Sequence, residues 1–300
     1  MVDRFHYYYS LSRNDDALFP CCDSDGRSAM TVLSLFPAAE GRPLAGLYLG
    51  LNLHRLAEAD DILIYSNYIT SLDGRISLTL DHAVGSQVPA DIINRRDWRL
   101  YQELAAQADV MITSARYFRQ LAKGEAQDLL PVGQQPEYAD ILAWRETQGL
   151  KSQPDILILS SSLDIPVAAL KQLQERRILI FTGNRADPVK IAELEAAGAE
   201  LFVMETPDVS GIAVKNLLIQ QGFRSAYMIA GPQLHQTLIA DRVLNRIFLT
   251  TRFRLIGGAS FDTIVSGEIG GAADLKLLSL YLDQNVTTTQ IFAQYALQQL

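Results

Sequence analysis

The side chains best placed to do chemistry stand in one short turn that contains Ser71, Asp73 and Arg75. The apolar segment Ile62–Tyr65 precedes this turn and is typical of a buried strand. A hydroxyl, a carboxylate and a guanidinium at a strand end suit a polar ligand, because together they offer hydrogen-bond donors and acceptors. Asp73-Gly74 is also a common turn pair, so a purely structural role for Asp73 is the alternative.

Composition and charge limit the classes of partner. The chain has 300 residues, of which 48% are hydrophobic and 20% charged, as in ordinary globular proteins. Its net charge of −8 argues against a protein that coats nucleic acid, but it permits a local basic pocket for a phosphorylated small molecule. The longest apolar runs have the length of strands, and the N-terminus lacks a signal-peptide pattern, so we expect no membrane partner.

The two cysteines, Cys21 and Cys22, are adjacent in the sequence. Neighbouring cysteines rarely bridge, so we expect no disulfide framework and a reducing, cytoplasmic environment. No second group of Cys or His accompanies this pair, so we expect no metal site.

Strand and helix patterns alternate after residue 60, which predicts an α/β fold with a mainly parallel sheet and helices on both faces. The strand candidates are Ile62–Tyr65, Val110–Thr113, Ile156–Ser160, Ile178–Thr182, Glu200–Met204, Ser225–Ala230 and Arg246–Arg252. The helix candidates are Ile92–Ala108, Ile165–Glu175, Pro188–Ala197, Ser210–Gln221 and Pro232–Ala240. The Gln-rich stretch around residues 133–136 reads as a loop insertion, and the part after Arg252 suits antiparallel edge strands.

The carboxyl ends of these strands carry residues that suit a phosphate-bearing ligand. In a parallel sheet these ends share one edge, where ligands bind. Small hydroxyl residues, glycines, a helix start and a nearby arginine follow the strands, namely Thr113, Ser114, Ser160, Ser161, Thr182, Gly183, Arg185, Gly231 and Pro232. Neither G-x-G-x-x-G nor a P-loop motif is present, which counts against a conventional Rossmann site and a P-loop nucleotidase.

Four motifs in order resemble the pyrimidine reductases of riboflavin synthesis, which are relatives of dihydrofolate reductase. The resemblance runs from about Asp61 to the C-terminus. Its motifs are Thr70–Arg75 followed by Gly85-Ser86, then Ala108–Ala115, then Ala230–Leu234, and finally Leu255–Gly258. The resemblance implies a dihydrofolate-reductase-like domain over residues 58–300, with residues 1–57 as an N-terminal extension of one or two strands.

The resemblance also implies an activity: an NADPH-dependent oxidoreductase that reduces a ribosylamino-pyrimidine 5′-phosphate to its ribitylamino form. Asp73 would be the catalytic, substrate-facing carboxylate. The implied substrate-binding residues are Ser71, Arg75 and Ser86. The implied cofactor-binding residues are Thr113, Ser114, Ser160, Ser161, Thr182, Gly183, Gly231, Pro232, Gln233 and Leu234. Ser161 or Arg185 would bind the 2′-phosphate of NADPH. The resemblance also implies that the chain forms a homodimer.

The sequence departs from the family pattern at the third motif. The family carries a glutamate directly before its Gly-Pro pair, and this chain has Ala230 there. The arginine expected in the helix before the second motif is also absent, where Leu104-Ala105-Ala106 stands. Two alternatives therefore stay open: an NADPH reductase of the same fold with a different small substrate, and a non-catalytic nucleotide-binding protein. The zinc signature of a fused deaminase is absent.

Overall fold

The computed structural model describes residues 31–79, 86–124, 126, 132–133, 135–173, 175–285 and 288–298. The predictions made for Cys21, Cys22 and Gly85, and for the side chain of Ser86, lie outside this part of the chain. Ser86 is placed only as backbone, in the short strand β5 (Ser86–Gln87).

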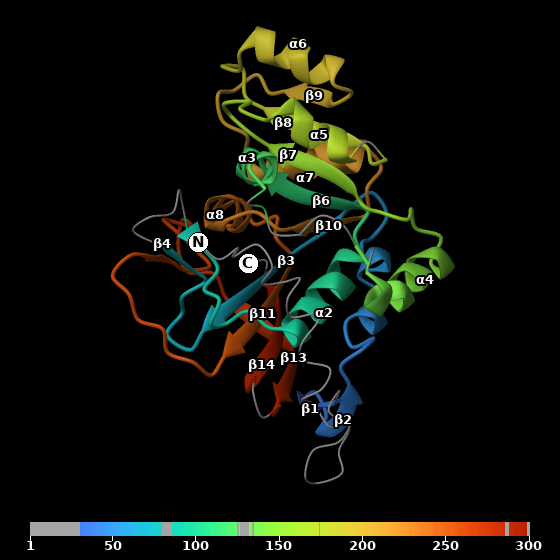
Figure 1. Ribbon diagram of the computed structural model, residues 1–300, viewed down its shortest axis with the longest axis vertical. Helices are drawn as coiled ribbons and strands as arrows, with labels where there is room; N and C mark the ends of the chain where they lie inside the picture. The colour runs from blue at the N-terminus through green and yellow to red at the C-terminus, as the bar shows by residue number, and fades with distance from the viewer. Residues whose placement is uncertain are drawn as a thin grey trace.

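One large sheet organises the molecule, with the strand order β2-β1-β13-β14-β11-β3-β10-β6-β7-β8-β9 (Figure 1). The strands from β11 to β9 all run parallel. Their bounds are β3 Leu63–Ser71, β6 Val110–Ser114, β7 Asp155–Leu159, β8 Ile178–Thr182, β9 Glu200–Val203, β10 Ser225–Met228 and β11 Arg246–Arg252. The predicted α/β class with a mainly parallel sheet is therefore confirmed.

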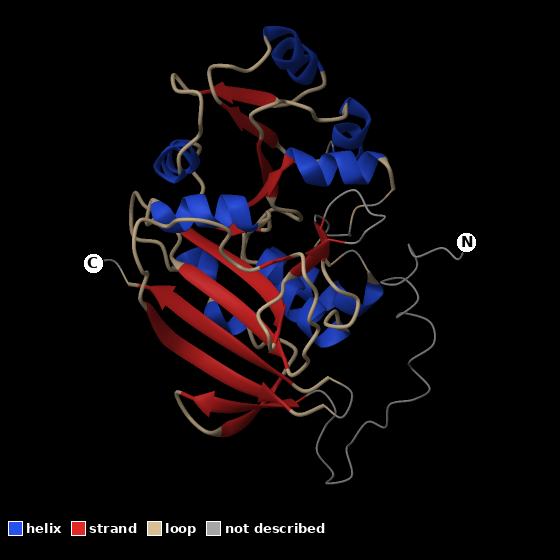
Figure 2. Ribbon diagram, turned by 90° about the vertical axis from the view of Figure 1, so that its left-hand side faces the viewer, coloured by secondary structure: helices blue, strands red, loops and turns tan. Residues whose placement is uncertain are grey.

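The other end of the sheet is antiparallel and lies in the lower half of Figures 1 and 2. It consists of β1 (Thr31–Phe36), β2 (Glu40–Pro43), β13 (Leu275–Asp283) and β14 (Gln290–Leu297). β1 pairs with β13, so the described part of the N-terminal extension belongs to the main sheet. This confirms the antiparallel strands expected after Arg252 and the strand expected in the extension.

Helices cover the parallel part on both faces because its strands are apolar on both sides. One face packs against α2 (Arg95–Ala105), α3 (Ala115–Ala122), α4 (Ala139–Thr147), α5 (Val167–Leu170) and α6 (Pro188–Ala196). The opposite face packs against α7 (Gly211–Gln220) and α8 (Pro232–Ala240). The Asn94 side chain caps α2 by accepting from the Arg96 and Asp97 amides, which explains why that helix begins there.

One expected helix was wrong in length, and one helix was not predicted. The helix expected over Ile165–Glu175 is only the single turn α5, followed by a short 3-10 turn, Lys171–Leu173. The region read as a loop insertion leads into α4, whose apolar pattern is masked because Arg145 occupies a core position. Arg145 is 1% exposed, and its guanidinium donates to the carbonyls of Ala106 and Ala108 at 2.6 and 3.0 Å.

A long connection, residues 253–274, leaves β11 and passes the strand-end turn before entering β13. Within it, β12 (Phe261–Asp262) pairs with β4 (Ser77–Thr79), which in turn pairs with β5. We call this stretch the 253–274 segment. Among the described residues, no helix is long and apolar enough to cross a membrane.

Candidate functional site

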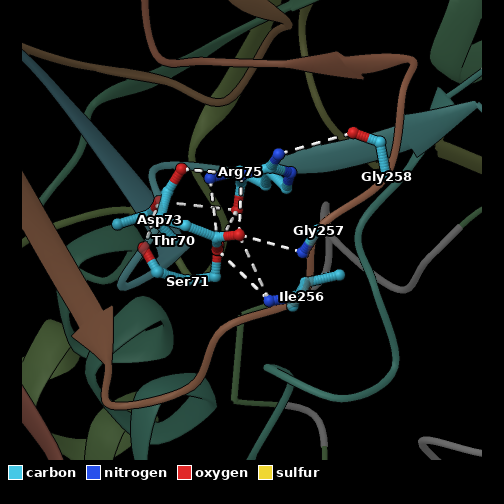
Figure 3. Close-up of polar contacts among 7 residues, drawn as sticks. All are labelled: Thr70, Ser71, Asp73, Arg75, Ile256, Gly257 and Gly258. Carbon is cyan, nitrogen blue, oxygen red and sulfur yellow. Dashed lines mark hydrogen bonds and ion pairs between the residues drawn. The ribbon is translucent and has the colours of Figure 1, made fainter.

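The turn after β3 brings together the side chains that the sequence placed there (Figure 3). Gly74 adopts φ +82°, a left-handed conformation that glycine takes without strain. The Ser71 hydroxyl accepts from the Arg75 amide at 3.0 Å and donates to the Asp73 carboxylate at 2.5 Å. The turn is therefore held by its own polar groups.

Asp73 also joins this turn to the 253–274 segment. Its carboxylate accepts from the Gly257 amide at 2.9 Å and from the Ile256 amide at 3.3 Å. Arg75 Nη1 donates to the same carboxylate at 2.7 Å. The Asp73 side chain is 21% exposed, so part of it remains accessible from solvent.

The charges of the turn balance one another. The hydrogen bond from Ser71, followed by that from the Gly257 amide, lowers the pKa of Asp73 to about 2. The Arg75 guanidinium lies 4.2 Å from the centre of the Phe261 ring, which adds a cation–π contact from β12. Asp73 is therefore fully ionised at neutral pH and fixed in position.

A second place suited to ligand binding lies where β10 and β6 run side by side. The chain leaves β6 into α3 on one face of the sheet and leaves β10 toward α8 on the other face. Such a reversal creates a crevice at the carboxyl ends of the strands, and this is where ligands bind in open α/β sheets. Both helices begin at the left-hand side of the sheet in Figure 1.

Both helices at this reversal begin without a side-chain cap. Neither Ser114, before α3, nor Gly231, before α8, makes a side-chain hydrogen bond to its helix. A Cβ added to Gly231 would meet nothing within 4 Å, so the start of α8 faces open space. The first amides of a helix lack partners within it and attract anions, so two such starts suit a pyrophosphate group.

The remaining predicted cofactor residues continue along the same edge of the sheet. Thr113, Ser160 and Thr182 lie at the ends of the adjacent strands β6, β7 and β8. From β10 to β8 the edge spans three strand spacings, about 14 Å. Exposed Ser161 and Arg185 follow β7 and β8, so a hydroxyl and a cation stand at the far end of this row.

Two of these residues, Gly183 and Ser160, also have structural partners. Gly183 packs so closely on the 206–207 backbone that an added Cβ would lie 1.8 Å from the Pro207 oxygen. The Ser160 hydroxyl accepts from the Leu163 amide at 3.0 Å. The Thr182 hydroxyl is buried, and no hydrogen-bond partner for it occurs in the described part of the chain. The two ends of this row of residues therefore suit the phosphate groups of an elongated cofactor. Gly183 is explained by its packing against the 206–207 backbone alone.

Sequence reasoning missed the side chains that hold α8. Tyr68, on β3, donates its hydroxyl to the Ala230 carbonyl at 3.2 Å. His235, on α8, is completely buried, and its Nδ1 lies 2.6 Å from the Ile264 carbonyl. A carbonyl can only accept, so Nδ1 carries the proton and Nε2 accepts from the Ser66 hydroxyl at 3.0 Å. Burial lowers the pKa of His235 to about 4, which keeps the ring neutral.

Sequence reasoning also missed a carboxyl group on the buried side of α2. Asp97 is 9% exposed and bonds to Thr250 of β11. Burial raises its pKa to about 6, and its Oδ1 has no hydrogen-bond partner among the described residues. Nothing in the local sequence signals this environment, because Thr250 comes from a distant strand.

Comparisons with known proteins agree with this architecture. The family model described as the RibD C-terminal domain matches residues 63–288. The chain belongs to this family. The riboflavin biosynthesis protein RibD of Bacillus amyloliquefaciens is 27% identical over 117 residues, which cover 39% of this chain and 32% of that protein. The chain thus spans about a third of the length of that curated relative.

Solved structures share the fold of this RibD-family chain. A pyrimidine reductase-like protein from Corynebacterium diphtheriae has a TM-score of 0.62 at 19% identity, covering 84% of this chain and 99% of that one. The deaminase/5-amino-6-(5-phosphoribosylamino)uracil reductase of Thermotoga maritima has a TM-score of 0.51 at 13% identity, covering 79% and 57%. The predicted kinship with riboflavin-pathway pyrimidine reductases is confirmed, and the fold is that of this group.

Proposed function

We propose that this chain is an NADPH-dependent reductase of the riboflavin-pathway type, which converts a ribosylamino-pyrimidine 5′-phosphate to the ribitylamino form. The main support is the pair of uncapped helix starts, those of α3 and α8, at the reversal between β6 and β10. The family match and the substrate in the name of the Thermotoga relative supply the pathway.

When bound, NADPH supplies a hydride from the nicotinamide ring. The proposed reaction would open the ribose to a ribityl chain: C1 would take the hydride, its bond to the ring oxygen would break, and that oxygen would take up a proton from water or a side chain. The protein's task is to align the two reactants and exclude water, since orientation contributes much of such rate enhancements.

We assign the α8 start to the cofactor's pyrophosphate, with Gly231, Pro232, Gln233 and Leu234 around it. Thr113, Ser114, Ser160 and Thr182 would follow the cofactor along the sheet edge, and Ser161 or Arg185 would meet the 2′-phosphate. On the substrate side we assign the partly exposed Asp73 as the catalytic carboxylate, with Ser71, Arg75 and Ser86 as substrate-binding residues.

One observation favours a different small substrate as the second candidate. Ala230 is 8% exposed and packs in the apolar cluster that includes α8, so no carboxylate is offered at that position. A substrate that needs a hydrogen bond from this point would bind poorly, because its polar group would stay unpaired. A non-catalytic nucleotide-binding protein is the third candidate. The proposal also includes a homodimer, as the family resemblance implies, and a cytoplasmic location, as the cysteine usage favours.

Titration of the protein with NADPH and with NADH, followed by nicotinamide fluorescence, tests the first step. We expect NADPH to bind more tightly, and the absence of binding by either at millimolar concentration would refute both reductase candidates. Loss of reduced-nicotinamide absorbance with the pathway pyrimidine would then identify the substrate, whereas cofactor binding without turnover would favour the other two candidates. Light scattering after gel filtration tests the homodimer.

A further inference from the structure

The start of α8 is held by two side chains of the same strand, β3. The Tyr68 hydroxyl donates to the carbonyl of Ala230, the residue before the Gly231 cap position. The Ser66 hydroxyl donates to His235 Nε2 at 3.0 Å. The Tyr68 and His235 rings are also in contact, with centroids 4.8 Å apart. These contacts join the strand to the first turn of the helix.

The other side of α8 is joined to the 253–274 segment. His235 Nδ1 donates to the Ile264 carbonyl at 2.6 Å, and Gln236 Nε2 donates to the Glu268 carbonyl at 2.7 Å. A single buried imidazole therefore bridges β3 and the 253–274 segment through α8. The hydrogen-bond partners of the ring in the described part of the chain are a hydroxyl and a backbone carbonyl, so the bridge depends on hydrogen-bond geometry and packing.

The first turn of α8 needs such external support. Its cap residue, Gly231, makes no side-chain bond to the helix, and Pro232 has no amide hydrogen. Only a few backbone amides of this first turn remain to bind an anion. The direction in which their N–H bonds point depends on the position of the Ala230–Gly231 peptide. A binding site that is already ordered avoids the entropy cost of ordering when the ligand arrives.

We propose that Tyr68 and His235 are positioning residues that hold the first turn of α8 so that its free amides meet the phosphates of the dinucleotide. This inference rests on the proposed function. Tyr68 acts through the Ala230 carbonyl, and His235 acts through Ser66 and Ile264. Neither residue takes part in the chemical step.

The chain offers a matched control for Tyr68. Tyr65 lies on the same strand and also donates its hydroxyl to a backbone carbonyl, that of Leu104, at 2.8 Å. Its side chain lies on the α2 face, away from α8. Tyr68→Phe and Tyr65→Phe each remove one such hydrogen bond and leave the ring in place, so both test the loss of the same interaction at different locations.

The experiment measures the NADPH dissociation constant and the melting temperature of both variants and of the wild type. A hydrogen bond of this kind corresponds to roughly twofold to tenfold in affinity, so we expect Tyr68→Phe to weaken NADPH binding by that factor. Tyr65→Phe should stay within about twofold of wild type, although both variants melt at lower temperature. A purely structural role for Tyr68 would lower only the melting temperature.

His235 gives a second arm. His235→Ala removes both bonds, whereas the amide of His235→Asn can still donate toward Ile264. We expect the alanine variant to bind NADPH more weakly than the asparagine variant. If His235→Ala does not fold, the tyrosine pair decides alone.

The outcomes separate the two claims. NADPH binding by Tyr68→Phe at the wild-type level, or equal weakening by Tyr65→Phe, would overturn the positioning role and leave the reductase proposal intact. A wild-type protein that binds neither NADPH nor NADH would remove the proposed function itself.

Discussion

The turn after β3 and the contact between α2 and β11 each contain one aspartate, and their surroundings are opposite. Asp73 lies partly exposed and accepts hydrogen bonds from Ser71, Arg75 and two amides of the 253–274 segment. Asp97 is buried, bonds to Thr250 and leaves Oδ1 without a partner among the described residues. Asp73, the more exposed of the two carboxylates, thus also accepts more hydrogen bonds.

The pKa values of these two groups follow from that difference. Hydrogen bonds to the charged form lower the pKa of Asp73 to about 2, while burial raises that of Asp97 to about 6. Asp73 therefore favours the folded state when it is charged, and Asp97 opposes folding when it is charged. The charge state of an aspartate therefore depends on the number of hydrogen-bond donors around its carboxylate, and not only on its place in the fold.

The largest effect is expected from Asp97→Asn. The folded-state pKa of Asp97 lies above its unfolded value, so its contribution to stability is full at low pH and is lost as pH rises through about 6. A rise in the pKa of Asp97 from its ordinary value to about 6 corresponds to a loss of roughly 3 kcal/mol in the free energy of unfolding at neutral pH and above. Asparagine can still accept from Thr250 without a charge, so near pH 8 the variant should gain up to that free energy of unfolding. Urea denaturation measures the gain.

The same measurement near pH 4 is the internal control for Asp97→Asn. Both proteins are then neutral at this position in the folded state, so the difference in their free energies of unfolding should shrink to a small fraction of its value near pH 8. Equal stability of the two proteins near pH 8 would show that the Asp97 carboxylate is compensated, for instance by the nearby Arg252 charge.

Asp73→Asn is expected to destabilise the structure locally, by less than Asp97→Asn stabilises it. The amide group cannot accept from all the donors that surround Asp73, and it loses the ion pair with Arg75. Hydrogen exchange of the Ile256 and Gly257 amides should accelerate by about tenfold. Under the proposed function turnover should fall while NADPH still binds, because the α8 start is untouched.

Exchange of the Leu249 amide, within the β11–β14 ladder, serves as the control for Asp73→Asn. Its rate should stay constant if only the 253–274 segment loosens. Loss of NADPH binding in this variant would instead place Asp73 on the cofactor side.

The comparison also explains what the sequence could and could not predict. Ser71, Asp73 and Arg75 are close in sequence, so their cluster was visible as a local motif. The environment of Asp97 depends on Thr250, and that of His235 depends on Ser66 and Ile264, all remote along the chain. Such pairings follow from strand order, which single-sequence patterns leave open.

The secondary structure shows the same limit. Most parallel strands were predicted close to their true ends because apolar, β-branched runs are a local signal. α4 was missed because Arg145 stands where an apolar residue would complete its stripe, and backbone carbonyls satisfy it only in the folded chain. Of the sheet edge that we propose for the cofactor, the sequence indicated the strand ends, but not the reversal between β6 and β10 that joins them.

The smallest effect is expected from Arg75→Lys, which sharpens the account of the β3 turn. Lysine keeps the charge beside Asp73 but loses the planar contact with Phe261 and the bond from Nη2 to the Gly258 carbonyl. That bond is 3.4 Å long and exposed, so little is lost with it. We expect amide exchange at Ile256 and Gly257 to rise by about twofold, well below the effect of Asp73→Asn. Arg75→Met, which removes the charge, should match Asp73→Asn if the ion pair closes the turn. If Arg75→Lys and Arg75→Met behave alike, the contact with Phe261 contributes more than the charge.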